Sequence, residues 1–399
     1  MLIFPADPEF IANPYPTYET LRRGPRVAYD EGTDHHLVTR HEDVSALLRD
    51  RRLGRSYLHL ATHEEMSRPP DKPELLPFWH LVRSGILDME PPDHTRVRAL
   101  VSKAFTPRFV ESLRPTVTQI CERLVDAVDG LPEFDMLPLI AEPLPVTVIA
   151  RMLGVPEQDH HLLRPWSADI CKMYELNPGP DAERDAVRAS IEFSDYLRAL
   201  SRQRRVDPGK DLISALTQVV DEGKRLTEDE LIGTCVLLLN AGHEATVNLT
   251  TLGWRALFVN PDQLEKLRDD PSLLPTAIEE LLRYDTPLQL FERWVLEPVE
   301  LGDQTVPRGA ELGLVFGSAN RDPAAFPEPD RLDVERSPNP HVTFGAGVHF
   351  CLGAPLARIE LISSFAAVLR RFPNIHAAEE PRFKPNYIIR GLESLRVGV

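Results

Sequence analysis

The stretch "HVTFGAGVHFCLGAPLARIE", residues 341–360, places one cysteine, Cys351, in a glycine-rich run directly before a predicted helix. Gly345, Gly347 and Gly353 allow tight turns and a close backbone approach, and the apolar spacing after them predicts an amphipathic helix. A thiolate is a soft metal ligand that backbone N–H groups and a helix N-terminus stabilise. The stretch therefore predicts a cysteine presented to a metal, and an inert cysteine in an ordinary loop is the alternative.

The other three cysteines occur in a different sequence context. Cys121, Cys171 and Cys235 are far apart and form no CxxC pair, which argues against a zinc knuckle and against the disulfide framework of a small secreted domain. We expect all three to be small buried hydrophobic residues.

Composition and charge exclude several classes of protein. A net charge of -16 disfavours nucleic acid and anionic membranes as partners, because both require basic surface. The first thirty residues are rich in proline and charge, and they resemble neither a signal peptide nor a long apolar span. We therefore expect a cytoplasmic protein without a membrane anchor.

The pattern along the chain predicts one domain, residues 1–399, because no repeat or low-complexity linker divides it. Apolar residues recur mostly at helical spacing, as in "TVTQICERLVDAVDGL", residues 116–131. Strand-like segments are few: residues 26–31, 35–40 and 296–316, the last with turns at 302–303 and 308–309. The predicted fold class is mainly α with a small β region.

One long helix is predicted from a capping box, Thr227 with Glu230, and it continues without proline until Pro261. Its middle, "LLLNAGHEAT" at residues 237–246, is unusual, since glycine inside a helix costs roughly 1 kcal/mol and a buried carboxylate is costly unless paired. One interpretation is a surface turn with a tolerated glycine. The other is that the backbone approaches a large flat ligand and that Glu244 is functional.

Several motifs together resemble one family. "FGAGVHFCLG", residues 344–353, is similar to the FGxGxHxCxG haem-binding signature of the cytochrome P450 monooxygenases. "AGHEAT" at 241–246, "EELLR" at 279–283, "ANRDP" at 319–323 and "PDRLD" at 329–333 resemble further family motifs, in the family's order. The resemblance implies a single triangular helical domain that holds haem b, iron protoporphyrin IX, between the long I helix and the L helix.

The resemblance also implies roles for individual residues. Cys351 would be the thiolate ligand of the haem iron. The haem propionates would bind His94, Arg98, Arg293 and His349, and the alternative for the first two is a solvated surface pair. The other implied haem contacts are Ala241, Gly242, Thr343, Phe344, Gly345 and Gly353. A buried structural triad would consist of Glu280, Arg283 and Arg331.

The sequence departs from the family pattern at the site of proton delivery. Most members carry threonine directly after the helix acid, whereas this chain has Glu244, then Ala245, then Thr246. Each helical residue turns about 100°, so Thr246 does not replace a hydroxyl at Ala245. The remaining proton routes are Glu244 through water, the kinked backbone, or a hydroxyl on the substrate. The alternative explanation of Ala245 is that its small side chain makes room for a bulky substrate, and the two explanations are compatible.

By the same resemblance, the substrate would lie against the loop 75–89 and a mostly apolar lining. The implied lining residues are Leu238, Ala241, Gly242, Ala245, Leu288, Gln289, Phe291, Ile388 and Ile389. Such a lining suits an apolar natural product of macrolide, polyketide or terpenoid type. The other reactants would be O2 and electrons from a ferredoxin and its reductase, because no flavin or iron–sulfur segment follows in the chain. Arg96, Arg108 and Arg358 would offer that partner a basic patch; the alternative is scattered solubilising arginines.

Two other functions stay open at this point. The first is a peroxide-driven or oxidative-coupling enzyme of the same fold, and Glu244 counts against peroxide use because such enzymes usually carry a basic residue near the helix kink. The second is a haem protein that senses gas or carries electrons without catalysis. Turnover of any substrate with reductant and oxygen separates the second from a monooxygenase.

Overall fold

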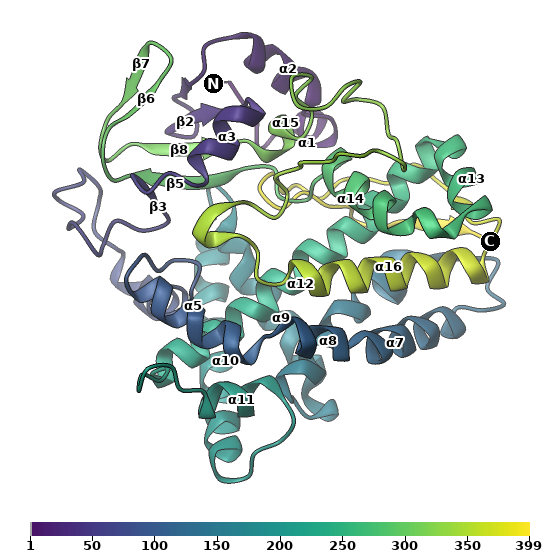
Figure 1. Ribbon diagram of the computed structural model, residues 1–399, viewed down its shortest axis with the longest axis horizontal. Helices are drawn as coiled ribbons and strands as arrows, with labels where there is room; N and C mark the ends of the chain where they lie inside the picture. The colour runs from purple at the N-terminus through teal and green to yellow at the C-terminus, as the bar shows by residue number, and fades with distance from the viewer. Residues whose placement is uncertain (1) are drawn as a thin grey trace. The chain divides into compact units, whose positions relative to one another are not determined.

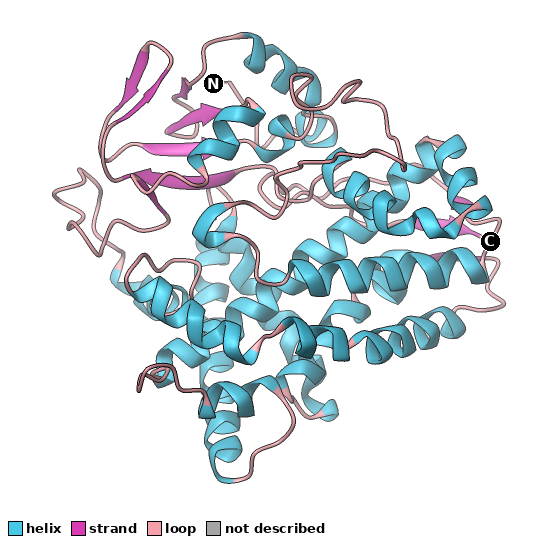
Figure 2. Cartoon of the chain, viewed as in Figure 1, coloured by secondary structure: helices cyan, strands magenta, loops and turns pink. Residues whose placement is uncertain are grey.

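Helices make up most of residues 2–399, which the computed structural model describes, and strands form three small sheets within this range (Figures 1 and 2). This confirms the predicted fold class, mainly α with a small β region. The chain divides into two units. Unit 1 comprises Met1–Gly54, Thr118–Pro143 and Ala245–Val399, and unit 2 comprises Arg55–Val117 and Leu144–Glu244.

The largest sheet belongs to unit 1 and has the strand order β1-β2-β8-β5-β3, with β2, β8 and β5 side by side in Figure 1. Its strands are β1 (Ala28–Asp30), β2 (His35–Val38), β3 (Leu53–Gly54), β5 (Phe291–Val295) and β8 (Glu311–Leu314). The predicted strands at 26–31 and 35–40 are confirmed as the antiparallel pair β1 and β2. β2 pairs with β8 in the parallel direction, so two segments that are distant in the sequence lie in one sheet.

Two smaller sheets complete the β structure of unit 1. β6 (Val299–Leu301) and β7 (Gln304–Val306) form an antiparallel hairpin, and Gly302 turns it with a φ of +68°. The predicted turn at 302–303 is therefore confirmed. The third sheet joins β4 (Glu133–Asp135), β10 (Arg396–Gly398) and β9 (His376–Ala377). These strands were not predicted, because a segment of two or three residues carries no readable alternation of apolar and polar positions.

In unit 1, two helices pack against α16, the helix that follows Cys351. α14 and α16 are in contact, and the ring of Trp254 stacks on that of Phe365 with centroids 4.8 Å apart. A Cβ on Gly253 would lie 3.0 Å from the Phe365 ring, so this close approach favours glycine. The helices are α1 (Pro8–Ala12), α2 (Tyr15–Arg23), α3 (His41–Leu47), α13 (Pro261–Asp269), α14 (Leu274–Tyr284), α15 (Phe316–Ala319) and α16 (Ala354–Arg371), with the short η2 (Leu137–Ala141), η5 (Pro271–Leu273) and η6 (Gly347–His349).

Unit 2 contains helices and, among its described residues, no named strand. α10 packs on α9 and on α4, and α11 packs on α5. Its helices are α4 (Leu76–Arg83), α5 (Asp93–Ala104), α6 (Pro107–Ser112), α9 (His160–Cys171), α10 (Pro180–Val206) and α11 (Leu212–Gln218), with the short η1 (Pro73–Leu75), η3 (Glu157–Asp159) and η4 (Lys172–Tyr174).

Three helices, α7 (Arg114–Ala127), α8 (Pro143–Leu153) and α12 (Glu228–Val259), are shared between the units. α12 confirms the predicted long helix and its capping box: the Glu230 carboxylate accepts a hydrogen bond from Thr227 N at 2.8 Å, and the Thr227 hydroxyl accepts one from Glu230 N at 3.2 Å. α7 confirms the helix predicted at 116–131. The single domain of residues 1–399 stays a prediction.

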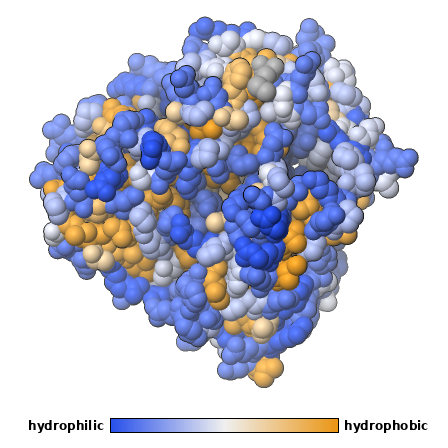
Figure 3. Space-filling view, turned by 180° about the vertical axis from the view of Figure 1, so that it is seen from behind, coloured by the Kyte–Doolittle hydropathy of each residue, from blue (hydrophilic) through white to orange (hydrophobic). Residues whose placement is uncertain are grey.

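The surface is mostly polar on the face that Figure 3 shows, where hydrophobic residues lie scattered among hydrophilic ones. Across residues 2–399, no helix combines the length and the apolar composition that crossing a lipid bilayer requires.

Candidate functional site

Cys351 lies in a tight loop at the start of α16. Its backbone N–H donates to the carbonyl oxygen of Phe344 at 2.9 Å, which closes the loop. Gly345 and Gly347 have φ values of +66° and +70°, so the predicted turn-forming glycines are confirmed. Cys351 is half-buried, whereas Cys121, Cys171 and Cys235 are buried, as predicted. The one partly accessible thiol therefore sits next to a helix N-terminus, which stabilises a thiolate.

The surroundings of Cys351 fit a flat metal cofactor. A Cβ on Gly345 would meet no heavy atom within 4 Å, and a Cβ on Gly353 would lie 4.0 Å from the Cys351 sulfur. The loop thus presents the Cys351 sulfur, a soft donor, next to two glycines that have no side chains. Gly347 has a different role, since a Cβ there would lie 2.4 Å from the carbonyl oxygen of Leu48.

An ion-pair network that the sequence analysis missed supports this loop. Arg358, on α16, donates Nε–H and Nη2–H to the Glu279 carboxylate at 2.6 and 2.8 Å, and His341 Nε2 lies 3.1 Å from the same group. Burial raises the pKa of Glu279, but the hydrogen bonds from Arg358 and His341 outweigh it and lower the pKa to about 2. The hydrogen bond to Glu279 is the main cause of a raised pKa for Arg358, and attraction to Cys351 adds to it. Arg358 and Glu279 thus form a charge-balanced pair that joins α16 to α14 beside the cysteine loop.

Thr343 supports the loop through its side chain. The Thr343 hydroxyl donates to the Leu282 carbonyl at 2.7 Å and accepts from the Asn320 amide at 2.9 Å. Asn320 also accepts from the Val342 backbone N–H at 2.8 Å. Both hydrogen bonds of the Thr343 hydroxyl are therefore made to other residues of the chain. The predicted haem contact of Thr343 stays a prediction.

The predicted pair of Glu280 and Arg283 is fully buried on α14. Arg283 Nε–H and Nη2–H each donate to the Glu280 carboxylate at 2.7 Å. Asn339 and the Asp333 backbone N–H donate to the same carboxylate at 3.1 and 3.0 Å. A buried charge pair is tolerable when hydrogen bonds satisfy its remaining atoms, and this one is extensively bonded.

The prediction of Arg331 as third member of this triad is wrong. The Arg331 side chain is 56% exposed and pairs with Glu328, three residues earlier. Arg336 takes the position instead, with its side chain 10% exposed and its Nε 3.1 Å from Glu280. Arg331 contributes only its backbone carbonyl, which accepts from Arg283 at 3.3 Å. The motif "PDRLD" contains the first of two nearby arginines, and only tertiary packing shows which of the two binds Glu280.

The middle of α12 exposes an apolar stripe. Ala241 and Ala245, one turn apart, are exposed, and Leu238 is half-buried on the same side. Thr246 is buried, and its carbonyl accepts from the Thr250 hydroxyl at 2.8 Å. Thr246 therefore does not share the open face of Ala245.

Two predicted residues beside this stripe have local partners in unit 2. A Cβ on Gly242 would lie 2.4 Å from the Cδ1 atom of Ile149, so packing against α8 already explains this glycine. Its predicted haem contact stays a prediction. The Glu244 side chain is 19% exposed, and its Oε1 lies 3.9 Å from His243 Nδ1.

The four predicted propionate partners belong to different units. In unit 2, His94 is buried on α5 and Arg98 is half-buried one turn later on the same face. In unit 1, Arg293 is 3% exposed on β5, and its guanidinium lies over the Phe291 ring at 4.6 Å. His349 is half-buried in η6. Their roles as propionate partners stay predictions.

The structure separates the predicted substrate residues of unit 1 into two groups. Leu288 and Ile389 form an isolated β-bridge and, like Phe291, are partly exposed, whereas Ile388 is buried. Gln289 as a lining residue is wrong. It is fully buried, and its amide donates to the Thr286 carbonyl at 2.6 Å and accepts from the Tyr18 hydroxyl at 3.0 Å.

Two further expectations need adjustment within their own units. The segment 75–89 is not all loop, because α4 occupies Leu76–Arg83. Arg96 pairs with Glu230 and Arg358 with Glu279, so both charges of the predicted basic patch are balanced by a neighbouring carboxylate. Arg108 is exposed.

Comparison with known proteins gives one consistent result. The family described as Cytochrome P450 matches residues 57–387. The polyketide biosynthesis cytochrome P450 PksS of Bacillus subtilis is 39% identical over 91% of this chain and 88% of its own. The cytochrome P450 monooxygenase PikC of Streptomyces venezuelae is 40% identical over 98% and 92%. The solved structure of P450BioI in complex with hexadec-9Z-enoic acid ligated acyl carrier protein aligns with a TM-score of 0.92 at 35% identity, over 98% of this chain and 99% of that one.

Proposed function

The chain belongs to the cytochrome P450 family, and from this premise we propose that it inserts one oxygen atom from O2 into an apolar natural product of macrolide, polyketide or terpenoid type. The family consists of haem b monooxygenases that use O2 and redox partners. We further propose a ferredoxin and its reductase as the electron source, and a cytoplasmic location.

The position of Cys351 carries this proposal. Cys351 would hold a haem through its thiolate, and the haem so held would supply oxygen activation. The residues of the chain provide the remaining functions: the glycine loop presents the sulfur, and the Arg358–Glu279 pair supports this loop. In the proposal, Arg98 and Arg293 neutralise the propionates and Glu244 delivers protons.

The apolar stripe on α12 supports the substrate class. Leu238, Ala241 and Ala245 offer methyl groups and no polar side chain, and Leu288 with Phe291 adds partly exposed apolar surface in unit 1. The relative PksS is named for polyketide biosynthesis, and P450BioI was solved with a long unsaturated acyl chain. Both support a substrate with an extended hydrocarbon skeleton.

The experiment that tests the function is a screen followed by turnover. Purified protein is titrated with a natural-product library for type-I spectral shifts, and compounds that bind are incubated with ferredoxin, reductase, NADPH and O2. One oxygen atom from labelled O2 in the product supports the proposal. Product only with added hydrogen peroxide favours the peroxide-driven alternative, and binding without any turnover favours a non-catalytic haem protein.

Ala245 predicts a dependence on the substrate's own polar groups. A substrate hydroxyl could replace the missing threonine. Removal of that hydroxyl should then leave binding largely intact, since affinity comes mainly from apolar burial. It should also divert oxygen from product to peroxide. The measurement is the ratio of product formed to reductant oxidised. Ala245→Thr should restore this ratio with the deoxy substrate, provided the added atoms fit.

Equal and high coupling with both substrates would contradict substrate assistance. The proton route would then be Glu244 through water, and Glu244→Gln should slow turnover by about 100-fold or more while the binding spectrum stays unchanged.

Arg293 predicts an effect on haem retention. Arg293→Ala removes a buried guanidinium that we assign to a propionate, at a cost of about 1.5–3 kcal/mol for a charge-assisted hydrogen bond. We expect a lower haem-to-protein ratio after gel filtration and faster haem transfer to apomyoglobin. The control is Arg308→Ala, an exposed arginine of the same unit. Equal haem transfer from both variants would remove Arg293 from the propionate site.

A further inference from the structure

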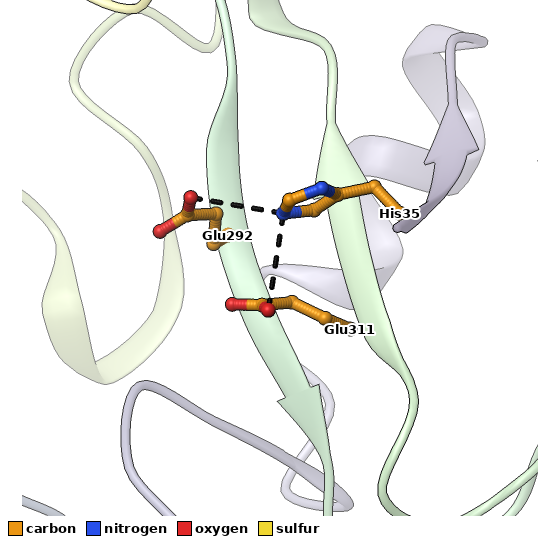
Figure 4. A group of neighbouring side chains, drawn as sticks. All are labelled: His35, Glu292 and Glu311. Carbon is orange, nitrogen blue, oxygen red and sulfur yellow. Dashed lines mark ion pairs between the residues drawn. The ribbon is translucent and has the colours of Figure 1, made fainter. Parts of the chain in front are cut away.

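Three strands of the largest sheet bring one imidazole and two carboxylates to the same face. His36 aligns with Leu312 between β2 and β8, so His35 lies beside Glu311. Glu311 aligns with Trp294 on β5, and Glu292 is two residues from Trp294, so side-chain alternation puts it on this face too. Figure 4 shows His35 between the two carboxylates. The cluster lies entirely within unit 1 and contains none of the residues assigned above to the haem or the substrate.

The surroundings of His35 resemble those of a metal-binding histidine before the metal binds. His35 Nδ1 lies 2.5 Å from the Thr33 carbonyl oxygen, an acceptor, so this nitrogen carries a proton, and in the neutral imidazole Nε2 keeps a lone pair that can bind a metal. The His35 side chain is 7% exposed, and among the described residues its Nε2 atom has no hydrogen-bond partner. Metal-binding histidines usually donate their other ring N–H in this way, which fixes the tautomer.

The distances in the cluster suit an intervening ion better than direct contact. Nε2 lies 3.7 Å from Glu292 Oε1 and 3.9 Å from Glu311 Oε2, too far for hydrogen bonds. All three ligand atoms lie within 4.8 Å of one another. Ligands at about 2.0–2.2 Å from a tetrahedral ion are about 3.3–3.6 Å apart, so each carboxylate would move toward His35 by a few tenths of an ångström, and the two carboxylates would approach each other by up to about 1 Å through side-chain rotation.

We propose that His35, Glu292 and Glu311 bind one divalent transition-metal cation of the zinc or manganese type. Imidazole favours zinc over magnesium or calcium, and two carboxylates balance the ion's double charge. Glu292 and Glu311 are 31% and 16% exposed, so water has access to the remaining coordination positions. The ion would join β2, β8 and β5 through their side chains, and its role would be to stabilise the sheet rather than to take part in oxygen chemistry.

The test uses the full-length, haem-loaded protein after treatment with EDTA and buffer exchange. Isothermal titration with ZnCl2, and separately with MnCl2, gives stoichiometry and affinity, and thermal unfolding is recorded with and without each ion. We expect one ion per chain and a higher Tm when it is bound. Glu292→Gln with Glu311→Gln should weaken binding by about 100-fold or more, since loss of an outer partner alone costs about 10- to 100-fold. Glu300→Gln, an exposed change on β6, is the matched control and should bind like wild type.

The outcomes of this metal-binding test can be distinguished from those of the tests on the haem. No stoichiometric ion and no change in the Tm of the wild-type protein at millimolar concentrations would overturn the proposal, whatever the variants do. Unchanged affinity in the double variant would assign the ion to other residues and overturn it equally. His35→Gln, which keeps a polar side chain of similar length, provides a second route if the double variant is unstable. The ultraviolet–visible spectrum of the haem should be the same in every case.

Discussion

Cys351→Ser is expected to lose the red-shifted Soret band of the reduced carbon monoxide complex and to reduce turnover to background. An alcohol or water is a poorer match for the haem iron than a thiolate, and it withholds the electron density that favours O–O cleavage. The surrounding loop should persist, because the Cys351 backbone N–H still donates to Phe344. The measurements are the reduced carbon monoxide difference spectrum and product formation at matched haem content.

Cys121→Ser is the matched control, because it makes the same chemical change within the same unit. Burial raises the pKa of Cys121 to about 12, so this thiol stays protonated at neutral pH and is a poor ligand. We expect Cys121→Ser to keep the band and the activity, with some loss of stability because a hydroxyl enters a buried site. A wild-type spectrum typical of histidine ligation would contradict the assignment of Cys351.

Features with local causes could be predicted from the sequence. The capping box of α12 depends on two residues three apart, and the turns at Gly302 and Gly345 depend on backbone freedom at one position. The partly accessible cysteine was predicted from one short motif whose glycines have the expected conformation. Such signals are written in consecutive residues, so no tertiary information is needed to read them.

Features with long-range causes could not be predicted in the same way. Gln289 stands in an apolar segment and was assigned to the substrate, but Tyr18, 271 residues earlier, binds its amide in the interior. Gly242 was interpreted through the haem, while Ile149 on another helix gives it a packing reason. The cluster of His35, Glu292 and Glu311 has no sequence signature, because strand register alone unites its members. In each case the deciding partner is distant in the chain.

The buried carboxylate of Glu280 predicts the second large effect. Glu280→Ala leaves Arg283 and Arg336 without their shared partner, and Arg283 is fully buried. Removing one member of a buried ion pair costs about 3–5 kcal/mol in the free energy of unfolding. We therefore expect a markedly lower urea midpoint of unfolding. Haem incorporation should also fall, because Asn320, whose carbonyl Arg283 binds at 2.9 Å, holds Val342 and Thr343 at the start of the cysteine loop.

Two arginines of one loop make the assignment of this triad testable. Arg336→Ala removes a side chain that donates to Glu280 and to the Pro327 carbonyl at 2.8 Å, at an expected cost of about 1.5–3 kcal/mol in the free energy of unfolding. Arg331→Ala removes an exposed partner of Glu328 and keeps the backbone carbonyl that Arg283 uses, so its expected cost is below about 0.5 kcal/mol. Urea unfolding of both variants, followed by far-ultraviolet circular dichroism and by the haem spectrum, gives the comparison. A larger loss for Arg331→Ala than for Arg336→Ala would reverse the assignment, because of these two arginines only Arg336 donates a side-chain hydrogen bond to the buried Glu280 carboxylate.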